Sequence, residues 1–492
     1  MTDGGVLLQG PQIAFGGRLR LFAHRWLVSL DDTYATQVVK HGYSPPEACY
    51  PVGRVEAQIP RVATRVIDSP LDTELRKLEV QEVVVRMASP PNSATKVISV
   101  SAIPKADGSY RIIVNPRLIN EELVGHPDIS IKVPTSEMVA ALIIPDDWAV
   151  RLDLKAAFFN VPITHLFSEF LCFRSPTGRW WKLLALPQGL RSSPKLFIRL
   201  LSPALILFRK AFPEVRLVAY FDDILALHQN KAVLSIATRW LVFIITYFGW
   251  VINMTKSILE PTQRLQFLGF RWDCVVHSVS LPEDRALRYM KDWKALRVSI
   301  RKKLPVPARI IAKVIGQMLS ITLCHATATF HCRHLMIALA YAISRAGRAA
   351  WKGEGVEICL DVMAIDQLDY WVSPVWRKEA TRLLTAVIHP PRPDFIIMAD
   401  ASPWAWGASL LKPDSTSPLD LASGRFDESE ASISHNQQEV LAPLLAYSLW
   451  APRFPPMSTV EVHSDNQAFV RAVMNQGSMV KLFNQGVMNI LD

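Results

Sequence analysis

The chain has 492 residues, of which 50% are hydrophobic and 20% charged, and it carries 54 Lys plus Arg against 44 Asp plus Glu. At about 100 to 200 residues per domain this length predicts several domains, and the apolar fraction excludes a mainly disordered chain. The formal net charge of +10 favours a polyanionic partner only if the positive charge is concentrated on one surface.

Cysteine usage and apolar segments indicate an intracellular protein with no membrane partner. The six cysteines are scattered along the chain, which favours a reducing compartment over a disulfide-bonded secreted scaffold. Residues 1–17 lack the basic and apolar regions of a signal peptide. The longest uncharged apolar run, 240–255, is shorter than the roughly 20 residues that a spanning helix needs.

The first half of the chain contains several predicted strands. Residues 97–103 and 111–114 flank a turn at 107–109, a pattern typical of a β-hairpin. Further strands are predicted at 148–154 and 215–220.

A helical pattern begins at about residue 283. Its apolar residues recur at spacings of three and four and predict a buried face made of Tyr289, Trp293, Leu296 and Ile300. The rest of its surface is basic, with cations at Arg285, Arg288, Lys291, Lys294, Arg297 and Arg301. After a proline-rich break at 389–393, residues 395–398 are predicted to form a buried strand.

Three aspartates accompany the strands of the first half. Asp153 lies near the end of the 148–154 strand, and Asp222 and Asp223 separate two apolar runs, which predicts a hairpin with acids in its turn. Burying carboxylates is costly unless a cation neutralises them. If the hairpin lies beside the first strand, Asp153 and Asp222 can share two Mg²⁺ ions for phosphoryl transfer, with Asp223 in support. An Asp-Asp pair considered alone is more often a solvated turn.

The motifs around these aspartates resemble those of the reverse transcriptase family. The sequence LDLKAAF at 152–158 resembles the family's strand-borne Asp motif, and YFDD at 220–223 resembles its aromatic-x-Asp-Asp hairpin. Between them, LPQGLRSSP at 186–194 resembles the motif that positions template and nucleotide through Gln188 and Gly189. The flanks extend the resemblance, to a fingers motif at 103–120 and to the last two polymerase motifs at 249–257 and 267–270.

The resemblance also implies roles for side chains outside the acidic cluster. Lys105 and Arg111 would hold the triphosphate of a dNTP, and Tyr220 would contact the nucleotide. Lys256 would be an acid for the pyrophosphate leaving group, with a solvated surface lysine as the alternative. Phe158 matches the family's aromatic steric gate, whose ring would clash with a ribose 2′-hydroxyl. The alternative for Phe158 is core packing.

A second set of acids follows the proline-rich break. Asp400, Glu439 and Asp465 occur in a strand, helix, strand order, and would converge if the strands are neighbours and the helix packs across them. Together they resemble a ribonuclease H domain, which could bind Mg²⁺. One departure from the family pattern is Ala405, where relatives often have Gly. The family's fourth acid lies well downstream of the third, whereas this sequence ends 27 residues after Asp465, at Asp492, which is too near to fill that role. We therefore expect a truncated domain of doubtful activity.

The resemblance implies an α+β protein with the right-hand polymerase architecture followed by a partial ribonuclease H-like α/β domain. The expected segments are a lead-in at 1–60, fingers and palm at 61–275, a thumb at 276–345, a connection at 346–390 and the ribonuclease H-like domain at 391–492. The sequences at 17–22, 42–43, 281–282, 314–319 and 333–335 resemble DIRS-like retrotransposon polymerases, of the tyrosine-recombinase class. A related long-terminal-repeat lineage is the alternative.

Three functions remain open on the sequence alone. The first is an RNA-directed DNA polymerase that uses dNTPs and an RNA or DNA template-primer. The second is a catalytically inactive nucleic-acid-binding remnant or host-recruited scaffold. The third is an RNA polymerase, which Phe158 and the ribonuclease H resemblance oppose.

One further cluster, between Cys324 and His334, contains cysteines and histidines. On a helix these side chains would not converge on one zinc ion, so we expect buried helical cysteines and exposed histidines.

The positive charge is concentrated in one segment. Residues 285–352 contain fourteen Lys or Arg and one acid, Asp292, which gives +13 and leaves −3 for the rest of the chain. A template-primer duplex would contact this segment through its phosphates.

Overall fold

The computed structural model describes residues 14–30, 32–45, 69–91, 98–105, 108–122, 131–302, 304, 306–352, 360–388, 392–415, 417–455, 458–464, 466–467 and 470. They divide into two compact units, Met1–Thr135 with Asp146–Gln263, and Ser136–Pro145 with Arg264–Asp492. The first unit ends at Gln263, because β10 (Arg264–Phe267) and β11 (Phe270–Asp273) belong to another sheet.

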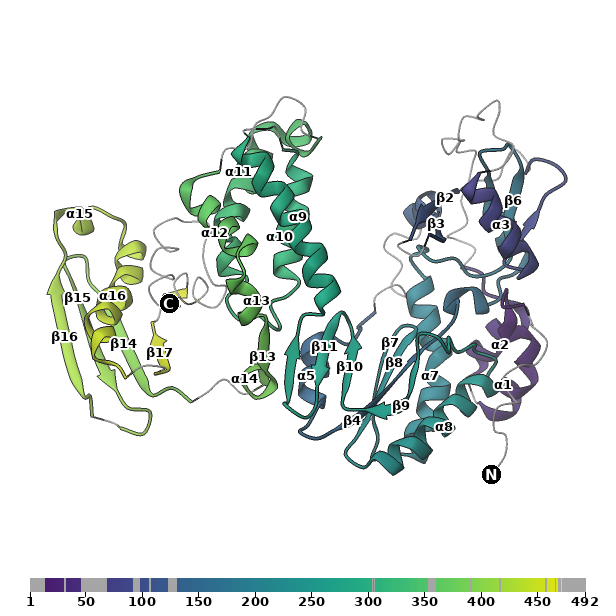
Figure 1. The fold of residues 1–492 in the computed structure, drawn as a ribbon, viewed down its shortest axis with the longest axis horizontal. Coiled ribbons are helices and arrows are strands. Elements are labelled where there is room, and N and C mark those ends of the chain that lie inside the picture. The colour runs from purple at the N-terminus through teal and green to yellow at the C-terminus, as the bar shows by residue number, and fades with distance from the viewer. Residues whose placement is uncertain are drawn as a thin grey trace. The chain divides into compact units, whose positions relative to one another are not determined.

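The first unit is built around a four-stranded antiparallel sheet of order β7-β8-β4-β9 (Figure 1). Its strands are β4 (Trp148–Asp153), β7 (Arg216–Tyr220), β8 (Asp223–His228) and β9 (Ile258–Thr262). The strands predicted at 148–154 and 215–220 are thus confirmed. Side chains alternate between the faces of a strand, so Val150 and Leu152 of β4 point into the main apolar core. Helices α7 (Ser193–Ala211) and α8 (Lys231–Tyr247) supply much of the remaining core.

Two smaller sheets complete the first unit. The predicted hairpin is confirmed as β2 (Ser99–Pro104) and β3 (Tyr110–Asn115). The other sheet has the order β1-β6-β5, with β1 at Val84–Arg86, β5 at Cys172–Arg174 and β6 at Trp180–Leu183. The remaining elements are η2 (Arg18–Phe22), α1 (Ala23–Ser29), α2 (Thr33–His41), α3 (Pro70–Val80), α4 (Arg117–Glu122), η5 (Ala157–Asn160) and α6 (His165–Ser168).

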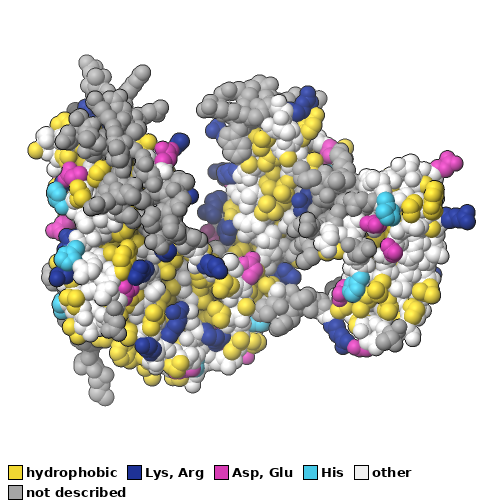
Figure 2. Space-filling view, turned by 180° about the vertical axis from the view of Figure 1, so that it is seen from behind, with side chains coloured by type: hydrophobic (Ala, Val, Ile, Leu, Met, Phe, Trp, Pro, Cys, Tyr) yellow, Lys and Arg dark blue, Asp and Glu magenta, His cyan; other side chains and the backbone are white. Residues whose placement is uncertain are grey.

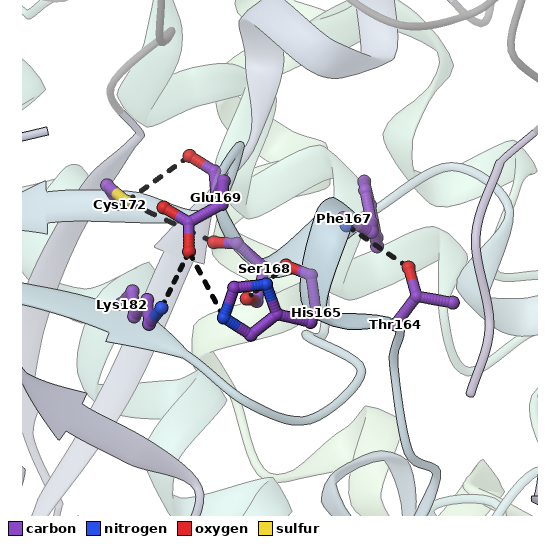
Figure 3. Close-up of polar contacts among 7 residues, drawn as sticks. All are labelled: Thr164, His165, Phe167, Ser168, Glu169, Cys172 and Lys182. Carbon is purple, nitrogen blue, oxygen red and sulfur yellow. Dashed lines mark hydrogen bonds and ion pairs between the residues drawn. The ribbon is translucent and has the colours of Figure 1, made fainter. Parts of the chain in front are cut away.

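Polar contacts join α6 to the β5–β6 pair (Figure 3). The Thr164 hydroxyl caps α6 by accepting a hydrogen bond from the Phe167 amide, and Glu169 forms an ion pair with Lys182 of β6 at 2.6 Å. The Cys172 thiol donates to the Glu169 carbonyl, and burial raises the pKa of this thiol to about 12. Cys172 is therefore a structural thiol, protonated at neutral pH.

The second unit contains a helical part and a small sheet. Strands β10, β11, β12 (Ser278–Ser280) and β13 (Thr381–Leu383) pair in that order. The helices are α5 (Ser136–Leu142), α9 (Glu283–Arg301), α10 (Ala308–Leu319), η6 (Phe330–Cys332), α11 (Arg333–Lys352), α12 (Val362–Val372), α13 (Val375–Glu379) and α14 (Leu384–Ile388). The predicted helix from residue 283 is confirmed, and Ala286, Tyr289, Trp293 and Leu296 form its buried face.

The prediction for the segment between Cys324 and His334 is only half right. Cys324 and Cys332 are buried as expected, but the chain from 320 to 329 forms turns and not a helix. The histidines are not exposed, because α12 supplies partners for them. His325 is fully buried with Nε2 2.7 Å from the Tyr370 hydroxyl, and the His331 ring stacks on Tyr370 at 3.7 Å. Burial lowers the pKa of His331 to about 4, so its ring is neutral at pH 7.

The C-terminal part of the second unit has a mixed sheet of order β16-β15-β14-β17. Its elements are β14 (Phe395–Ala401), β15 (Ala405–Leu411), β16 (Asp420–Arg425), α15 (Glu428–Ala431), α16 (His435–Trp450), η7 (Ala451–Arg453) and β17 (Val460–His463). Helix α16 lies across β14 and β15 (Figure 1). The strand predicted at 395–398 is confirmed, but it is not buried throughout. Ile397 is fully buried, whereas Met398, on the other face, is 48% exposed.

None of the helices in the described ranges is both long and apolar enough to cross a membrane.

Gly42 gives a test of the contact between α2 and the chain before α6. Gly42 has φ 95°, and a Cβ there would lie 2.4 Å from the backbone of Ile163, so Gly42→Ala should destabilise the first unit by at least about 1 kcal/mol. Gly316 on α10 is the control, because it has open space and alanine favours helix by about 1 kcal/mol. Thermal unfolding should show a lower midpoint for Gly42→Ala and no loss for Gly316→Ala. An unchanged midpoint in Gly42→Ala would contradict this reading of the contact.

Candidate active site

The predicted acidic hairpin is formed by β7 and β8. Tyr220 pairs with Asp223, so only Phe221 and Asp222 make the turn. Phe221 has φ 52°, a left-handed conformation that is uncommon for an aromatic residue. Its ring contacts that of Tyr220 at 5.1 Å. Asp222 therefore lies at the tip of a tight and conformationally demanding turn.

Pairing of β4 with β8 brings the three aspartates together. Asp153 lies directly opposite Asp223 in the antiparallel register, so the two side chains share one face of the sheet. Beyond the strand end, the Leu154 amide donates to the Asp222 carbonyl at 2.9 Å. The hairpin thus lies beside the first strand, which was the condition for Asp153 and Asp222 to act as one site.

The site holds more negative charge than its buried position favours. Burial raises the pKa of Asp222, and the charges of Asp153 and Asp223 raise it further, while Lys256 acts in the opposite direction. Burial also raises the pKa of Asp223, against the opposing effect of Arg151. Each ionised aspartate therefore makes ionisation of the next less favourable.

Arg151 neutralises one of the three carboxylates. Its Nε donates to Asp223 Oδ1 at 2.7 Å and its terminal nitrogen donates to Oδ2 at 3.1 Å, which is a bidentate pair. Among the described residues, no such ion pair engages Asp153 or Asp222. The sequence analysis missed Arg151, although its place two residues before Asp153 on one strand puts both side chains on the same face.

The carboxylates of Asp153 and Asp222 are compatible in chemistry with the predicted magnesium site. Within the part of the chain that the structure describes, no three His, Cys, Asp or Glu side chains are arranged to hold a metal ion. Mg²⁺ does not need three, because it is commonly bound by one or two carboxylates together with water and substrate phosphates. Two hard carboxylates, of which Asp222 has a raised pKa, match that chemistry.

The turn after α8 supports Asp153 through the backbone. The Asn253 amide donates to the Asp153 carbonyl at 2.7 Å, and the Ser257 hydroxyl accepts from the Asp153 amide at 3.0 Å. Lys256 lies in this turn, is exposed, and interacts electrostatically with Asp222 and Asp223. The position of Lys256 is thus compatible with the role of acid, which stays a prediction.

Phe158 lies on η5, just after the strand that carries Asp153. Its ring contacts that of Phe197 at 5.0 Å, and Phe197 contacts Trp250 at 5.3 Å. Phe158 and Phe159 are both partly buried against the main core. Because Phe158 is only partly buried, packing on Phe197 does not conflict with a role as a steric gate, which stays a prediction.

Gln188 and Gly189 lie on an exposed loop that Asn120 holds in place. The Asn120 side chain donates to the Gly189 carbonyl at 2.8 Å and accepts from the Arg191 amide at 2.7 Å. Gly189 has φ 91°, and a Cβ there would lie 2.9 Å from the Val114 carbonyl oxygen. Only glycine fits this close approach.

Lys105 and Arg111 lie on the β2–β3 hairpin, on a different sheet from the aspartates. Both side chains are exposed, and the Lys105 amide closes the hairpin turn by donating to the Ser109 carbonyl at 2.7 Å. No contact between described residues joins either cation to Asp153 or Asp222. Their assignment to the triphosphate stays a prediction.

The second predicted acidic site is only partly described. The conditions for its convergence hold, because β14 and β17 are parallel neighbours and α16 packs on β14. Asp400 lies on β14, whereas Asp465 lies outside the described residues. Glu439 on α16 pairs with His435 at 3.1 Å and accepts from the Asn466 side chain at 2.6 Å. Among the described residues, no contact joins Asp400 to Glu439.

Two of the six predicted grip cations on α9 serve the fold. Arg297 forms a bidentate pair with Asp369 of α12, and Arg285 donates to the Gly269 carbonyl and the Tyr289 and Ser320 hydroxyls. The exposed members are Arg288, Lys291, Lys294 and Arg301. Lys and Arg side chains gather along one edge of the helical part (Figure 2).

The raised pKa of Asp222 gives a test that does not require enzymatic activity. Asp222→Asn should raise the unfolding midpoint of metal-free protein at neutral pH, because it removes a buried charge whose pKa is raised. A carboxyl group whose pKa is higher in the folded than in the unfolded protein stabilises the fold at pH values below its unfolded pKa. This stabilisation is lost as the pH rises through the folded pKa. The advantage of Asp222→Asn should therefore shrink in acid, where wild-type Asp222 is protonated. Calorimetry from pH 4 to pH 8 tests this, and a lower midpoint for the variant at neutral pH would contradict it.

The central part of the chain is similar to known proteins. Residues 103–272 match the family model described as reverse transcriptase (RNA-dependent DNA polymerase). The Gag-Pol polyprotein of Avian leukosis virus subgroup A is 28% identical over 232 residues, which cover 44% of this chain and 14% of that protein. The Gag-Pol polyprotein of Baboon endogenous virus is 32% identical over 170 residues, which cover 33% of this chain and 9% of that protein.

A foamy viral protease-reverse transcriptase solved with double-stranded DNA is 15% identical, with a TM-score of 0.46, over 96% of this chain and 80% of that one. The matched segments are 14% or less of the length of these two polyproteins. By the family match, residues 103–272 of this chain form a reverse transcriptase domain.

Proposed function

We propose that the chain is an RNA-directed DNA polymerase of a retrotransposon, which extends a primer on an RNA or DNA template. The observation that carries the proposal is the convergence of Asp153 and Asp222, through the β4–β8 register and the bond from Leu154 to Asp222. This pair lies inside the segment that matches the reverse transcriptase family model.

The chemistry follows from where the carboxylates lie. Asp153 and Asp222 would hold two Mg²⁺ ions, which when bound activate the primer 3′-hydroxyl and stabilise the charge on the leaving pyrophosphate. Arg151 opposes the rise in the pKa of Asp223 and holds its carboxylate beside them. Lys256, whose positive charge acts on Asp222 and Asp223, would deliver a proton to the pyrophosphate.

We assign substrate selection to residues on η5, on the loop of Gln188 and Gly189, on β7 and on the β2–β3 hairpin. Phe158, supported by Phe197, would exclude the ribose 2′-hydroxyl and so favour dNTPs over NTPs. Gln188 and Gly189 would position template and nucleotide, and Tyr220 would contact the nucleotide. Lys105 and Arg111 on the β2–β3 hairpin would neutralise the triphosphate.

Primer extension tests the proposal directly. With a primed RNA template, dNTPs and Mg²⁺, the wild-type chain should extend the primer, and Asp222→Asn should lower the rate by at least about 10³-fold because a metal ligand is lost. Glu214→Gln is the control, since Glu214 is an exposed acid just before β7. Equal rates for Asp222→Asn and wild type would refute the assignment.

A catalytically inactive nucleic-acid-binding protein is the second candidate, and the exposed cations of α9 favour it independently of the aspartates. A gel-shift experiment with a template-primer, combined with the primer-extension assay, distinguishes the polymerase from the inactive binder. Binding of a template-primer with no extension under any divalent metal would select the inactive binder.

The α9 cations give a prediction that holds for both candidates. Replacing Arg288 and Lys291 by Gln should weaken binding of any duplex sequence, because phosphate contacts carry no base specificity. The slope of log K against log salt should fall by about 2 if each cation contacts one phosphate. Lys210→Gln, an exposed lysine on α7, is the control. An unchanged slope in the double variant, measured by fluorescence anisotropy, would exclude this helix from the interface.

We also propose assignments for the remaining segments. Residues 1–60 are the lead-in, 61–275 the fingers and palm, 276–345 the thumb and 346–390 the connection. Residues 391–492 form a ribonuclease H-like domain, supported by the parallel pairing of β14 with β17 and by α16 across β14. Mg²⁺ would be held there by Asp400 and Glu439, with Asp465 as the third ligand. The motifs at 17–22 and 314–319 support a DIRS-like lineage, and the site of action is intracellular.

A further inference from the structure

Residues 16–29, named here the N-terminal brace, bind the end of a helix that leads into the active site. Three side chains of the brace donate to successive carbonyls: Arg25 to Tyr247, Trp26 to Phe248 and Arg18 to Gly249, each at 3.0 Å. These carbonyls belong to the last residue of α8 and the two residues after it. At the C-terminal end of a helix the carbonyls have no backbone amide partners within the helix, and the helix dipole is negative. The brace thus caps α8 with two cations and an indole.

Shape as well as polarity fixes this contact. Gly249 has φ 93°, and a Cβ there would lie 2.5 Å from the ring of Phe22. Trp26 is fully buried, with its ring 5.0 Å from that of Phe248. The turn after α8 therefore has little freedom to move while the brace is in place.

The brace also contacts η5, the short helix that carries Phe158. The Gly17 amide donates to the Phe159 carbonyl at 2.8 Å, and a Cβ on Gly17 would lie 3.3 Å from Pro162. One short segment at the start of the described chain thus binds both η5 and the turn after α8.

These two bound segments are the ones that flank Asp153. From the turn, Val251 accepts from the Lys155 amide and the Asn253 amide donates to the Asp153 carbonyl, both at 2.7 Å. Trp250 of the same turn contacts Phe197, which in turn supports Phe158. A displacement at Gly249 would pass through two ring contacts to the predicted gate.

We infer that the brace sets the position of the Phe158 ring and thereby the discrimination between dNTPs and NTPs, with Arg18 and Trp26 as its positioning residues. The inference rests on the proposed polymerase function and goes beyond it, because neither residue lies at the acidic site. Loosening the brace should change sugar selection more than overall turnover, since a gate discriminates by sub-ångström clearance whereas the carboxylates are also held by the β4–β8 register.

The test uses the full chain with three single variants. Trp26→Phe removes the indole N–H but keeps an aromatic ring, and Arg18→Gln removes the guanidinium. Asp32→Asn is the matched control, because it removes the ion pair between α2 and Arg199 while Asn keeps the N-cap hydrogen bond from Ala35. Melting curves establish that each variant is folded.

The readout is the ratio of kcat/KM for a dNTP to that for the matching NTP. Trp26→Phe and Arg18→Gln should each lower the ratio by about fivefold, the order expected when one positioning hydrogen bond is lost. Asp32→Asn should leave the ratio within about twofold of wild type. Folded brace variants with wild-type ratios would overturn the inference, as would an equal loss in Asp32→Asn.

Two further measurements distinguish a failure of this inference from a failure of the steric-gate assignment or of the proposed polymerase function. Phe158→Ala should strongly lower the ratio of kcat/KM for a dNTP to that for the matching NTP. If the ratio is unchanged in this variant, the assignment of Phe158 as the gate is wrong, independently of the brace variants. Hydrogen exchange needs no activity. The amides of Lys155, Phe159 and Asn253 should exchange faster in Arg18→Gln than in wild type or Asp32→Asn. Unchanged exchange rates would overturn the inference that the brace positions these segments, even if the chain extends no primer.

Discussion

The structure of the first unit depends on the pairing of β4 with β8, which places acidic residues opposite one another at a partly buried sheet end. Antiparallel pairing in one register puts the side chains of Asp153 and Asp223 on one face, and the two-residue turn adds Asp222 beside them. Like charges so close together oppose folding. The strand pairing must therefore be stabilised elsewhere, and the core residues on the opposite face of the same strands, such as Leu152 and Ile224, provide that stabilisation.

The surrounding contacts are those that such a strained arrangement requires. Arg151 neutralises Asp223, and the turn at Asn253 and Ser257 fixes the backbone of Asp153 without adding charge. This leaves Asp153 and Asp222 able to accept a cation. Functional sites are often arranged in ways that cost stability, which is a common compromise between stability and function. Here the compromise is confined to one end of one sheet.

Basic residues in the second unit show that charge along a sequence does not equal charge on a surface. Arg285 and Arg297 have the same helical spacing as Arg288 and Lys291, yet they are used for contacts within the unit. Arg297 differs because it meets Asp369 on α12, 72 residues away in sequence. Arg285 differs because it meets the Gly269 carbonyl, 16 residues away. The same long-range packing buries His325 and stacks the half-buried His331 on Tyr370, where the sequence pattern predicted exposed histidines.

The sequence by itself determined the local features of this protein. Strand alternation and turn composition predicted β4, β7 and the acidic hairpin, and motif order indicated the family before any geometry was known. Only the tertiary structure decided which distant groups meet. Arg151 with Asp223, Asn120 with Gly189, and the brace with Gly249 are contacts whose partners are separated by 69 to 231 residues. The reason is physical: periodicity reports which face of an element is apolar, but a hydrogen bond between distant segments depends on how several elements pack at once.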